Sequence, residues 1–378
     1  SLNGFPVVSF DGTDDYYVHS LGALGAPLSI LSVTNFTQSK DQGYFSLGND
    51  NDNSTASISR ESDDRYYNFS ESTKLYGPVL SNNTPYILEV KHSINSPFHE
   101  LSVDGSATAV SDRSDELTTN GESVLGSDKD LAKFFEGNTS EFIIYEQKLN
   151  SAQEIILNNY LSTKYGISIS NDKYNFDTNY KYDLAGIGRV DASNLHTKAQ
   201  SAGILSIGGA NDLDNNEFLM FGHDNANIST WTNTEVPGND VNMQRLVREW
   251  KIDVDGGDGP GEVIIGIDPS LLPSLPAGFI AYNVIVDDDG DFSSGASAYG
   301  LISSGNELVS TPVTLADGAY ICIAAIKPVV SFDSSYSEGL ESVKFPEFDV
   351  SLNYAITSQL EVDYSVISGT ATAGDDYS

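Results

Sequence analysis

Short runs of alternating hydrophobic and polar residues dominate the chain from Phe5 to Gly166. Clusters of Gly, Asn, Asp and Ser separate these runs, and such residues favour turns. Many short alternating segments with turns between them predict an antiparallel β-sandwich, in which one face of each strand covers a core. The clearest runs are Ile30–Val33, Tyr44–Leu47, Tyr86–Val90, Glu100–Val103 and Glu141–Tyr145.

One stretch departs from this alternation and predicts a helix from Ser151 to Tyr165. Ser151 and Glu154 have the spacing of a capping box, and Gly166 stands where a helix commonly ends. The hydrophobic residues recur at helical spacing and are expected to form one apolar face. They are Ile155, Ile156, Leu157, Tyr160, Leu161 and Tyr165.

The pattern becomes β-rich again from Tyr174 to Ile326, and Pro328 opens a third β-rich segment. The lone cysteine, Cys322, lies in an apolar run, which predicts a buried strand thiol and excludes a disulfide framework within this chain. The predicted fold is therefore all-β, with tandem antiparallel sandwiches and one short helix. The predicted domains are residues 1–168, 174–326 and 328–378.

Charge narrows the set of partners. The chain has 54 Asp and Glu against 19 Lys and Arg, a net charge of −35. Such a field repels phosphate backbones and anionic lipids, so nucleic acid is not an expected partner. No apolar run reaches transmembrane length, so direct membrane insertion is not expected either. Ser1 does not begin a signal peptide, and an export signal would have to precede it.

The densest acidic cluster contains Asp287, Asp289 and Asp291 around Gly290. Oxygen ligands spaced around a glycine turn are typical of calcium loops, although the closing Glu of an EF-hand is missing here. A plain Asp/Gly turn between two strands explains the same residues. Both interpretations remain open at this stage.

Tyr66 and Tyr67, next to Asp64, are candidates for a ligand-binding surface. Aromatic rings beside a carboxylate suit sugar recognition, but an exposed strand carries tyrosines without any ligand as well. No nucleophile elbow, phosphate loop or zinc-protease motif occurs, and the five histidines lack metal-ligand spacing. An enzyme is not expected, although the many carboxylate pairs keep a glycoside hydrolase or lyase as the alternative.

The first domain resembles a known family at its two ends. Phe10–Tyr16 at the start, and Glu141–Tyr145 with Tyr160–Gly166 at the end, resemble a LamG-like jelly roll of the concanavalin A type. The second region is similar to an accessory domain that follows LamG-like modules in large surface proteins of Bacteroidota. The segments that carry this similarity are Asp183–Arg189, Phe218–Asp224 and Val247–Ile252.

The third segment resembles the first half of a Calx-β domain, an Ig-like calcium-binding sandwich found in tandem arrays. The resemblance lies in Ser331–Glu338, Leu360–Val366 and Ser368–Tyr377. It implies calcium ligands at Glu338 and Asp376. It also implies that the chain is a piece of a longer protein whose neighbouring domains are its partners.

Together these patterns lead us to expect a non-catalytic segment of a secreted bacterial cell-surface adhesin, of the gliding-motility or type 9-secreted kind. It would bind a glycan or a surface-protein ligand, and calcium would stiffen its modules. Two alternatives stay open: the accessory portion of a carbohydrate-active enzyme, and a purely structural calcium-loaded spacer. Fold analogy alone does not decide between them.

Overall fold

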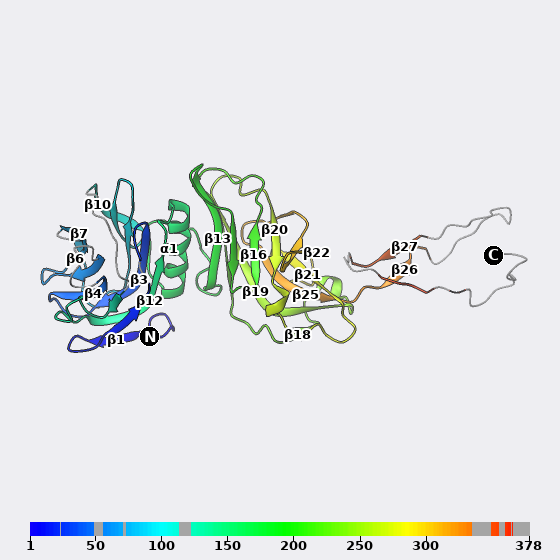
Figure 1. The fold of residues 1–378 in the computed structure, drawn as a ribbon. Helices are drawn as coiled ribbons and strands as arrows, with labels where there is room; N and C mark the ends of the chain where they lie inside the picture. Colours follow the sequence, from blue (N-terminus) through cyan, green and yellow to red (C-terminus); the bar gives the residue numbers. More distant parts are fainter. Residues whose placement is uncertain are drawn as a thin grey trace, which may run out of the picture.

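A computed structural model describes residues 1–22, 24–48, 56–70, 73–112, 122–334, 349–354, 360–363 and 365. Two β-sandwiches follow each other along the chain, with α1 (Ser151–Tyr165) between them and a short β-hairpin after the second (Figure 1). The described sheets are antiparallel throughout, and the all-β prediction is confirmed.

The first sandwich is a jelly-roll type of fold made of two six-stranded sheets that face each other. The first sheet has the order β1 (Val8–Asp11), β12 (Glu136–Tyr145), β3 (Leu28–Phe36), β8 (Tyr86–His92), β9 (His99–Val103), β10 (Ser106–Ser111). The second has the order β2 (Tyr17–Ser20), β11 (Glu122–Leu125), β4 (Gln42–Leu47), β5 (Ala56–Arg60), β6 (Arg65–Ser70), β7 (Thr73–Val79). All five clearest sequence runs lie in these strands.

Aromatic rings fill the centre of the first sandwich. Phe36, Tyr44 and Phe135 are fully buried, with ring centroids 5.0 to 6.2 Å apart. These edge-to-face contacts add to the stabilisation that burial of so much apolar surface provides. Phe36 and Tyr44 come from the facing strands β3 and β4, and Phe135 comes from the residue just before β12.

Helix α1 begins and ends where the sequence predicted, but its cap differs. The capping residue is Asn150, whose side chain accepts hydrogen bonds from the backbone of Ala152 and Gln153, and Gln153 bonds back to Asn150. The predicted box of Ser151 and Glu154 is therefore wrong by one residue, because an amide oxygen one position earlier reaches the free N–H groups. Gly166 ends the helix with φ of 69°, as predicted.

The apolar residues of α1 cover two faces of the helix rather than one. Leu161 and Tyr165 pack on the outer side of the β12–β3–β8 sheet, with Leu31 and Val33. Ala152 and Ile156 pack instead into the second sandwich, against Leu184, Phe218 and Met220. A helix that is apolar on opposite faces is buried on both, and α1 is thus shared by the two sandwiches (Figure 1).

The second sandwich is one rolled 13-stranded sheet. Its ladder has the order β14 (Asn194–His196), β13 (Tyr182–Asp191), β17 (Glu217–His223), β19 (Met243–Asp255), β25 (Tyr320–Ile326), β21 (Ala281–Asp287), β22 (Ser297–Ser304), β23 (Glu307–Ser310), β20 (Glu262–Ile267), β16 (Leu205–Gly208), β15 (Lys198–Ser201). Off this path, β18 (Trp231–Thr232) pairs with β19, and β24 (Val313–Thr314) pairs with β20. Two short 3-10 helices are η1 (Pro237–Asn239) and η2 (Pro269–Leu271).

The rolled sheet closes around one core. Near the two ends of the ladder, β13 and β15 lie in contact, and Trp250 is fully buried between the layers with its Nε1 donating to Ser201 Oγ at 3.0 Å. Cys322 is also fully buried in β25, and burial raises the pKa of its thiol. The prediction of a buried strand cysteine is confirmed.

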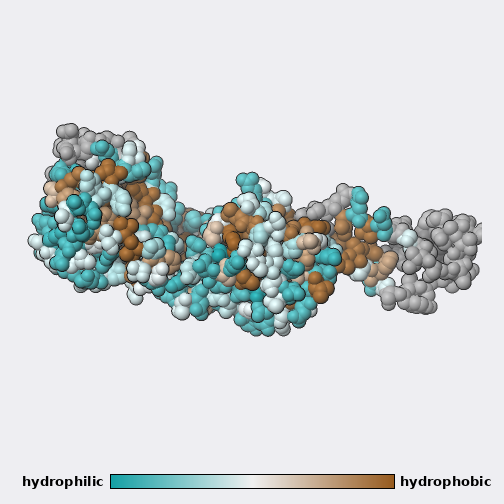
Figure 2. All heavy atoms as spheres, turned by 90° about the horizontal axis from the view of Figure 1, so that it is seen from below, coloured by the Kyte–Doolittle hydropathy of each residue, from teal (hydrophilic) through white to brown (hydrophobic). Residues whose placement is uncertain are grey.

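The third segment contains the hairpin of β26 (Val330–Phe332) and β27 (Val350–Leu352). Its hydrophobic side chains lie at the surface (Figure 2), where Phe332 is 62% and Val350 is 56% exposed. Residues 360–363, expected in a strand, are in none, and among the described residues no strand pairs with them.

A buried charged cluster fixes α1 to the first sandwich. Lys91 of β8 lies 2.5 Å from Glu154 of α1 and 2.9 Å from Glu100 of β9. Glu89, also on β8, is 2% exposed, and its Oε1 has no hydrogen-bond partner among the described atoms. Burial, together with the negative charges of Glu154 and Glu100, raises the pKa of Glu89 to about 8 against the opposing effect of Lys91.

We expect a polypeptide of residues 150–326 to fold and one of residues 174–326 to aggregate. Without α1, the apolar side chains of Leu184, Phe218 and Met220 lose their cover. Size-exclusion chromatography and thermal unfolding of the two polypeptides would check this. Equal melting temperatures would show that α1 is dispensable for the second sandwich.

We also expect stability to fall as pH rises from about 4.5 to about 8, because the native state holds the proton of Glu89 more tightly than the unfolded chain does. Glu89→Gln should remove this fall, so that the variant is more stable than the unchanged protein at pH 9, by up to a few kcal/mol at about 1.4 kcal/mol per pKa unit. Urea unfolding at pH 5, 7 and 9 measures it. The control Glu100→Gln should instead destabilise, since Lys91 and Lys148 lose their partner.

Candidate ligand-binding groove between the two sandwiches

The predicted ligand residue Tyr66 is not at the surface. Its side chain is fully buried in the core of the first sandwich, where its hydroxyl donates to the backbone oxygen of Glu89 at 3.3 Å. The β5–β6 register pairs Tyr66 with Arg60, which also points inward over Phe36. The prediction of a surface role for Tyr66 is wrong, because strand register turns alternate residues to opposite faces.

Tyr67 is not at the surface either, because only 7% of it is exposed, and a cation of the chain lies over its ring. The Lys74 ammonium lies 4.3 Å from the Tyr67 ring centroid, and the Arg65 guanidinium lies 4.4 Å from the ring of Tyr76. Glu61 then accepts from Lys74 and from the Tyr76 hydroxyl. A sugar could stack here only by displacing these cations, so cation–π contacts within the chain occupy the predicted platform.

Asp64 is likewise engaged within the protein. Its Oδ1 lies 2.7 Å from the guanidinium of the buried Arg60, and its Oδ2 accepts from Ser39 at 2.9 Å. A φ of 67° places its backbone in the left-handed region at a tight turn. Asp64 therefore supplies the counter-charge that the buried Arg60 guanidinium needs.

The acidic loop after β21 is built from local turns. Asp287 is buried, and its Oδ1 accepts from the backbone N–H groups of Asp289 and Gly290. Asp289 in turn accepts from the N–H of Asp291, and Asp291 from Ser293. The three carboxylates therefore stabilise successive turns and do not converge, so this loop does not fit a calcium ion as folded.

A different acidic group does converge. Within the ranges that the structure describes, the only set of three or more metal-ligating side chains with donor atoms within 4.8 Å of one another is Asp11, Asp14 and Asp15. All three are exposed, and exposed acidic groups are common without an ion. The remaining predicted calcium ligands, Glu338 and Asp376, lie outside the described residues.

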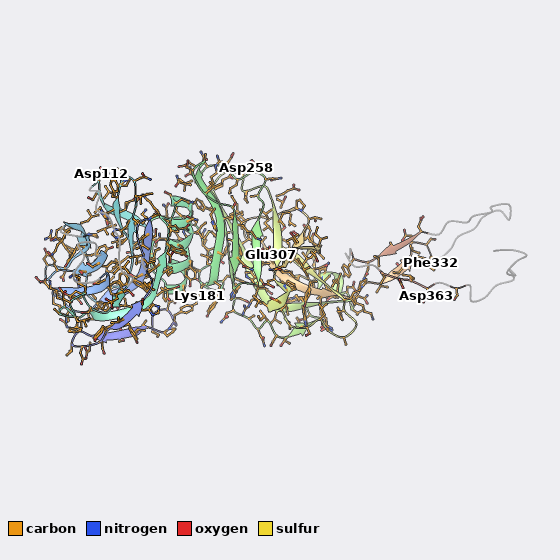
Figure 3. The ribbon with its side chains drawn as sticks, viewed as in Figure 1. Asp112, Lys181, Asp258, Glu307, Phe332 and Asp363 are labelled. Atoms are coloured by element: carbon orange, nitrogen blue, oxygen red, sulfur yellow. The ribbon has the colours of Figure 1, made fainter. Side chains whose placement is uncertain are left out.

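The N-terminal segment is clamped between α1 and β13. The Phe5 ring lies between the ammonium groups of Lys164 and Lys181, at 5.5 and 5.7 Å, and contacts the rings of Tyr165 and Tyr182. Lys181, labelled in Figure 3, lies at the junction of the two sandwiches. We call these five residues the clasp. A hollow of about 360 Å³ beside the clasp is also lined by Glu141 and Asp183.

Both carboxylates of this hollow accept hydrogen bonds from side chains of the same protein. Glu141 accepts from the Tyr160 hydroxyl at 2.9 Å, the Lys164 ammonium at 2.9 Å and the Tyr165 hydroxyl at 2.8 Å. Asp183 accepts from Nε2 of the buried His223 at 2.9 Å. That hydrogen bond lowers the pKa of Asp183, and the charges of Lys164 and Arg248 act in the same direction.

On the other side of α1 lies a groove of about 480 Å³, which we call the interdomain groove. One wall comes from the end of β12 and from α1, and the other from β13 to β15. The lining includes Tyr145, Gln147, Gln153, Leu157 and Tyr160 on the first wall and Leu184, His196, Lys198 and Gln200 on the second. Its volume is in the range of about 300–1,000 Å³ typical of small-molecule sites.

Backbone and cap contacts hold the two walls together. Asn150 donates its side-chain N–H to the oxygen of Leu195 at 3.1 Å, and Asn194 accepts from the backbone of Ser151 at 3.2 Å. The helix N-terminus is therefore pinned to β14, and Gln153 in the first helical turn is held by the cap. The groove lies between two elements that the fold already fixes to each other.

Polar groups in the groove are neutral hydrogen-bonding groups for the most part. Gln147 and Gln200 are exposed, and Tyr145 and Tyr160 are partly exposed. Burial lowers the pKa of His196, which favours the uncharged imidazole. Aromatic rings beside amides, hydroxyls and an imidazole can stack on sugar rings and exchange hydrogen bonds with sugar hydroxyls.

Sequence reasoning missed this groove because its walls are some forty residues apart in the chain. Tyr145 and Tyr160 were identified only as part of a strand and of an apolar helix face, and Gln147, His196 and Gln200 gave no signal. The available signal was the helix itself, since apolar residues on two faces imply a second packing partner.

Comparisons with known proteins give a family without a known role. Residues 153–319 match a family described as a domain of unknown function, DUF8202. No curated protein matches the chain. Neither α1 nor the 3-10 helices of the described part is long and apolar enough to cross a membrane.

Among solved structures, similarity is low. A heptameric SAP-like pentraxin from Limulus polyphemus is 16% identical, with 40% of this chain and 81% of the pentraxin covered and a TM-score of 0.34. The CBM40 of the Ruminococcus gnavus IT-sialidase, bound to α2,3 sialyllactose, is 13% identical over 40% of this chain and 95% of that module, with a TM-score of 0.31. Trypanosoma rangeli sialidase is 11% identical over 39% of this chain, which spans 26% of the sialidase, with a TM-score of 0.32. Likeness at this level carries no argument about ligand or activity.

We expect Asp289→Asn with Asp291→Asn to leave any calcium-dependent rise in melting temperature unchanged. Asparagine keeps the oxygen that accepts each turn hydrogen bond, and the native carboxylates do not converge on an ion. Thermal unfolding in excess calcium and in chelator measures the rise, since an ion that binds only the native state raises the melting temperature. Asp14→Asn with Asp15→Asn is the matched control. Loss of the rise in the first variant alone would restore the loop as a calcium site.

Proposed function

We propose that this chain is a non-catalytic, glycan-binding segment of a secreted, multidomain bacterial cell-surface adhesin. The observation that carries the proposal is the interdomain groove, whose lining of tyrosines, amides and a neutral imidazole suits sugar hydroxyls and ring faces. The residues that line the groove do not include any of the Asp287 loop.

Binding in this groove would use both sandwiches at once. The ring of Tyr145 on the first wall offers a face for stacking, and Tyr160 lies beside it with Lys164 4.9 Å from its ring centroid. On the second wall Gln200 offers its amide oxygen, since its amide nitrogen donates to Gly203. Tyr160 is oriented by its hydrogen bond to Glu141, and this positioning lowers the entropy that the protein loses on binding. The expected affinity is modest, as suits an adhesin that gains strength from many copies.

Glu141 and Asp183, the two carboxylates beside the clasp, accept hydrogen bonds within the chain, and this supports binding rather than hydrolysis. A glycosidase needs one carboxyl group that stays protonated to act as a general acid. Glu141 accepts three hydrogen bonds, two from phenols and one from an ammonium, and the His223 hydrogen bond lowers the pKa of Asp183. Asp183 is thereby favoured in its ionised form, which is unsuited to that role, and Glu141 is already engaged by three donors of the chain.

A structural spacer is the second candidate, and the double packing of α1 favours it. A helix buried in both sandwiches, together with the clasp around Phe5, makes the junction stiff. A spacer needs this stiffness but has no use for an open groove lined by amides. The two candidates therefore differ in whether the groove binds a ligand.

We expect the protein to bind at least one class of oligosaccharide on a glycan array, and Gln147→Ala with Gln200→Ala to weaken that binding about tenfold. Each lost hydrogen bond contributes about 1 kcal/mol, and about 1.4 kcal/mol corresponds to a factor of ten. Both side chains are exposed, so the fold should not change. Isothermal titration calorimetry with the best array binder measures the loss.

Asn233→Ala is the matched control, because Asn233 is an exposed amide outside the groove lining. It should bind like the unchanged protein. Absence of binding to every glycan on the array would favour the spacer. Binding that the double variant retains in full would place the glycan elsewhere on the molecule.

A further inference from the structure

We propose that the interdomain groove selects neutral glycans and rejects acidic ones. This inference rests on the proposed function and names the class of sugar that the same groove takes. The observation behind it is how the charges of the chain are distributed around the groove.

The groove offers no free cation to an anionic sugar within its described lining. Lys198 is the one charged member, and its ammonium lies 2.5 Å from Glu307 of β23. The other polar members are amides, phenols and His196, whose pKa burial lowers. A carboxylate or sulfate entering the groove would lose its water without gaining a counter-charge, which is costly.

Acidic side chains occur close to the groove in the chain. Glu146 is exposed and follows the lining residue Tyr145, while Asp183 lines the hollow beside the clasp. The chain as a whole has a net charge of −35, so the potential over the groove repels anions before they arrive. Neutral sugars meet no such repulsion, and their hydroxyls find amide donors and acceptors.

Two lysines near α1 are paired with acidic and aromatic side chains. Lys91 is buried between Glu100 and Glu154, and Lys164 between Glu141 and the rings of Phe5 and Tyr160. These lysines hold α1 and the clasp and are not among the residues that line the groove. In so acidic a chain, structural pairing leaves the groove without free positive charge.

The test compares matched pairs of oligosaccharides on one array and then by calorimetry. The pairs are oligomers of glucose and glucuronic acid, of galactose and galacturonic acid, and of mannose and mannuronic acid, each pair with the same linkage. In every pair with measurable binding, we expect the neutral member to bind at least about tenfold more tightly at low salt. The gap should narrow as salt rises, because ions screen the exposed acids.

Variants that add positive charge test whether the lack of free cations in the groove causes the selectivity. Gln147→Lys with Gln200→Lys should raise affinity for the acidic members by about tenfold or more, since each added ammonium supplies the missing counter-charge. Asn233→Lys with Asn179→Lys is the control, because it changes the net charge equally at exposed positions outside the groove lining. An equal gain in the control would mean that overall charge, and not the groove, decides.

The outcomes distinguish selectivity for neutral glycans from glycan binding itself, which is the proposed function. Tighter binding of the acidic members would overturn the selectivity and leave glycan binding intact. Failure of every pair, and of every other glycan on the array, to bind would overturn both. Neutral selectivity that the Gln147 and Gln200 variants do not alter would also overturn the assignment to this groove.

Discussion

Burial of α1 on two opposite sides is the constraint on which the rest of this structure depends. Leu161 and Tyr165 complete the outer layer of the first sandwich, while Ala152 and Ile156 cover Leu184, Phe218 and Met220 of the second. Neither sandwich can lose the helix without exposing apolar surface, so the two are held at a fixed angle. The interdomain groove follows directly, since its walls are the helix and the strands that the helix covers.

Scarcity of positive charge shapes the molecule in a second way. With 19 cationic residues against 54 acidic ones, several lysines and arginines serve as partners for buried or aromatic groups. Arg60 is fully buried beside Asp64 and Phe36, and Lys251 lies 3.3 Å from the ring centroid of Tyr320. Cations used in this way stabilise the fold but are not available to a ligand. The surface that remains is acidic or neutral, which links the stability of the junction to the chemistry of its groove.

Tyrosines of the first sandwich have different roles. Tyr44 and Tyr66 are buried and use their hydroxyls within the core, whereas the rings of the buried Tyr67 and the more exposed Tyr76 hold cations. Tyr145 and Tyr160 are partly exposed beside the interdomain groove, and Tyr160 also bonds Glu141 and carries Lys164 on its ring. A tyrosine becomes a candidate for ligand contact only when the tertiary structure leaves part of its ring uncovered.

The sequence by itself determined the local elements of this protein. Alternation located the strands that contain Ile30–Val33 and Glu141–Tyr145, helical spacing located α1, and an apolar run identified Cys322 as buried. These are consequences of short-range periodicity, which each segment carries in its own residues. Tertiary structure decided which face of β6 holds Tyr66, how the Asp287 carboxylate is used, and that residues near Tyr145 and near His196 line one groove. Strand register, turn hydrogen bonds and the packing of distant segments fix these features, and no periodicity within one segment encodes them.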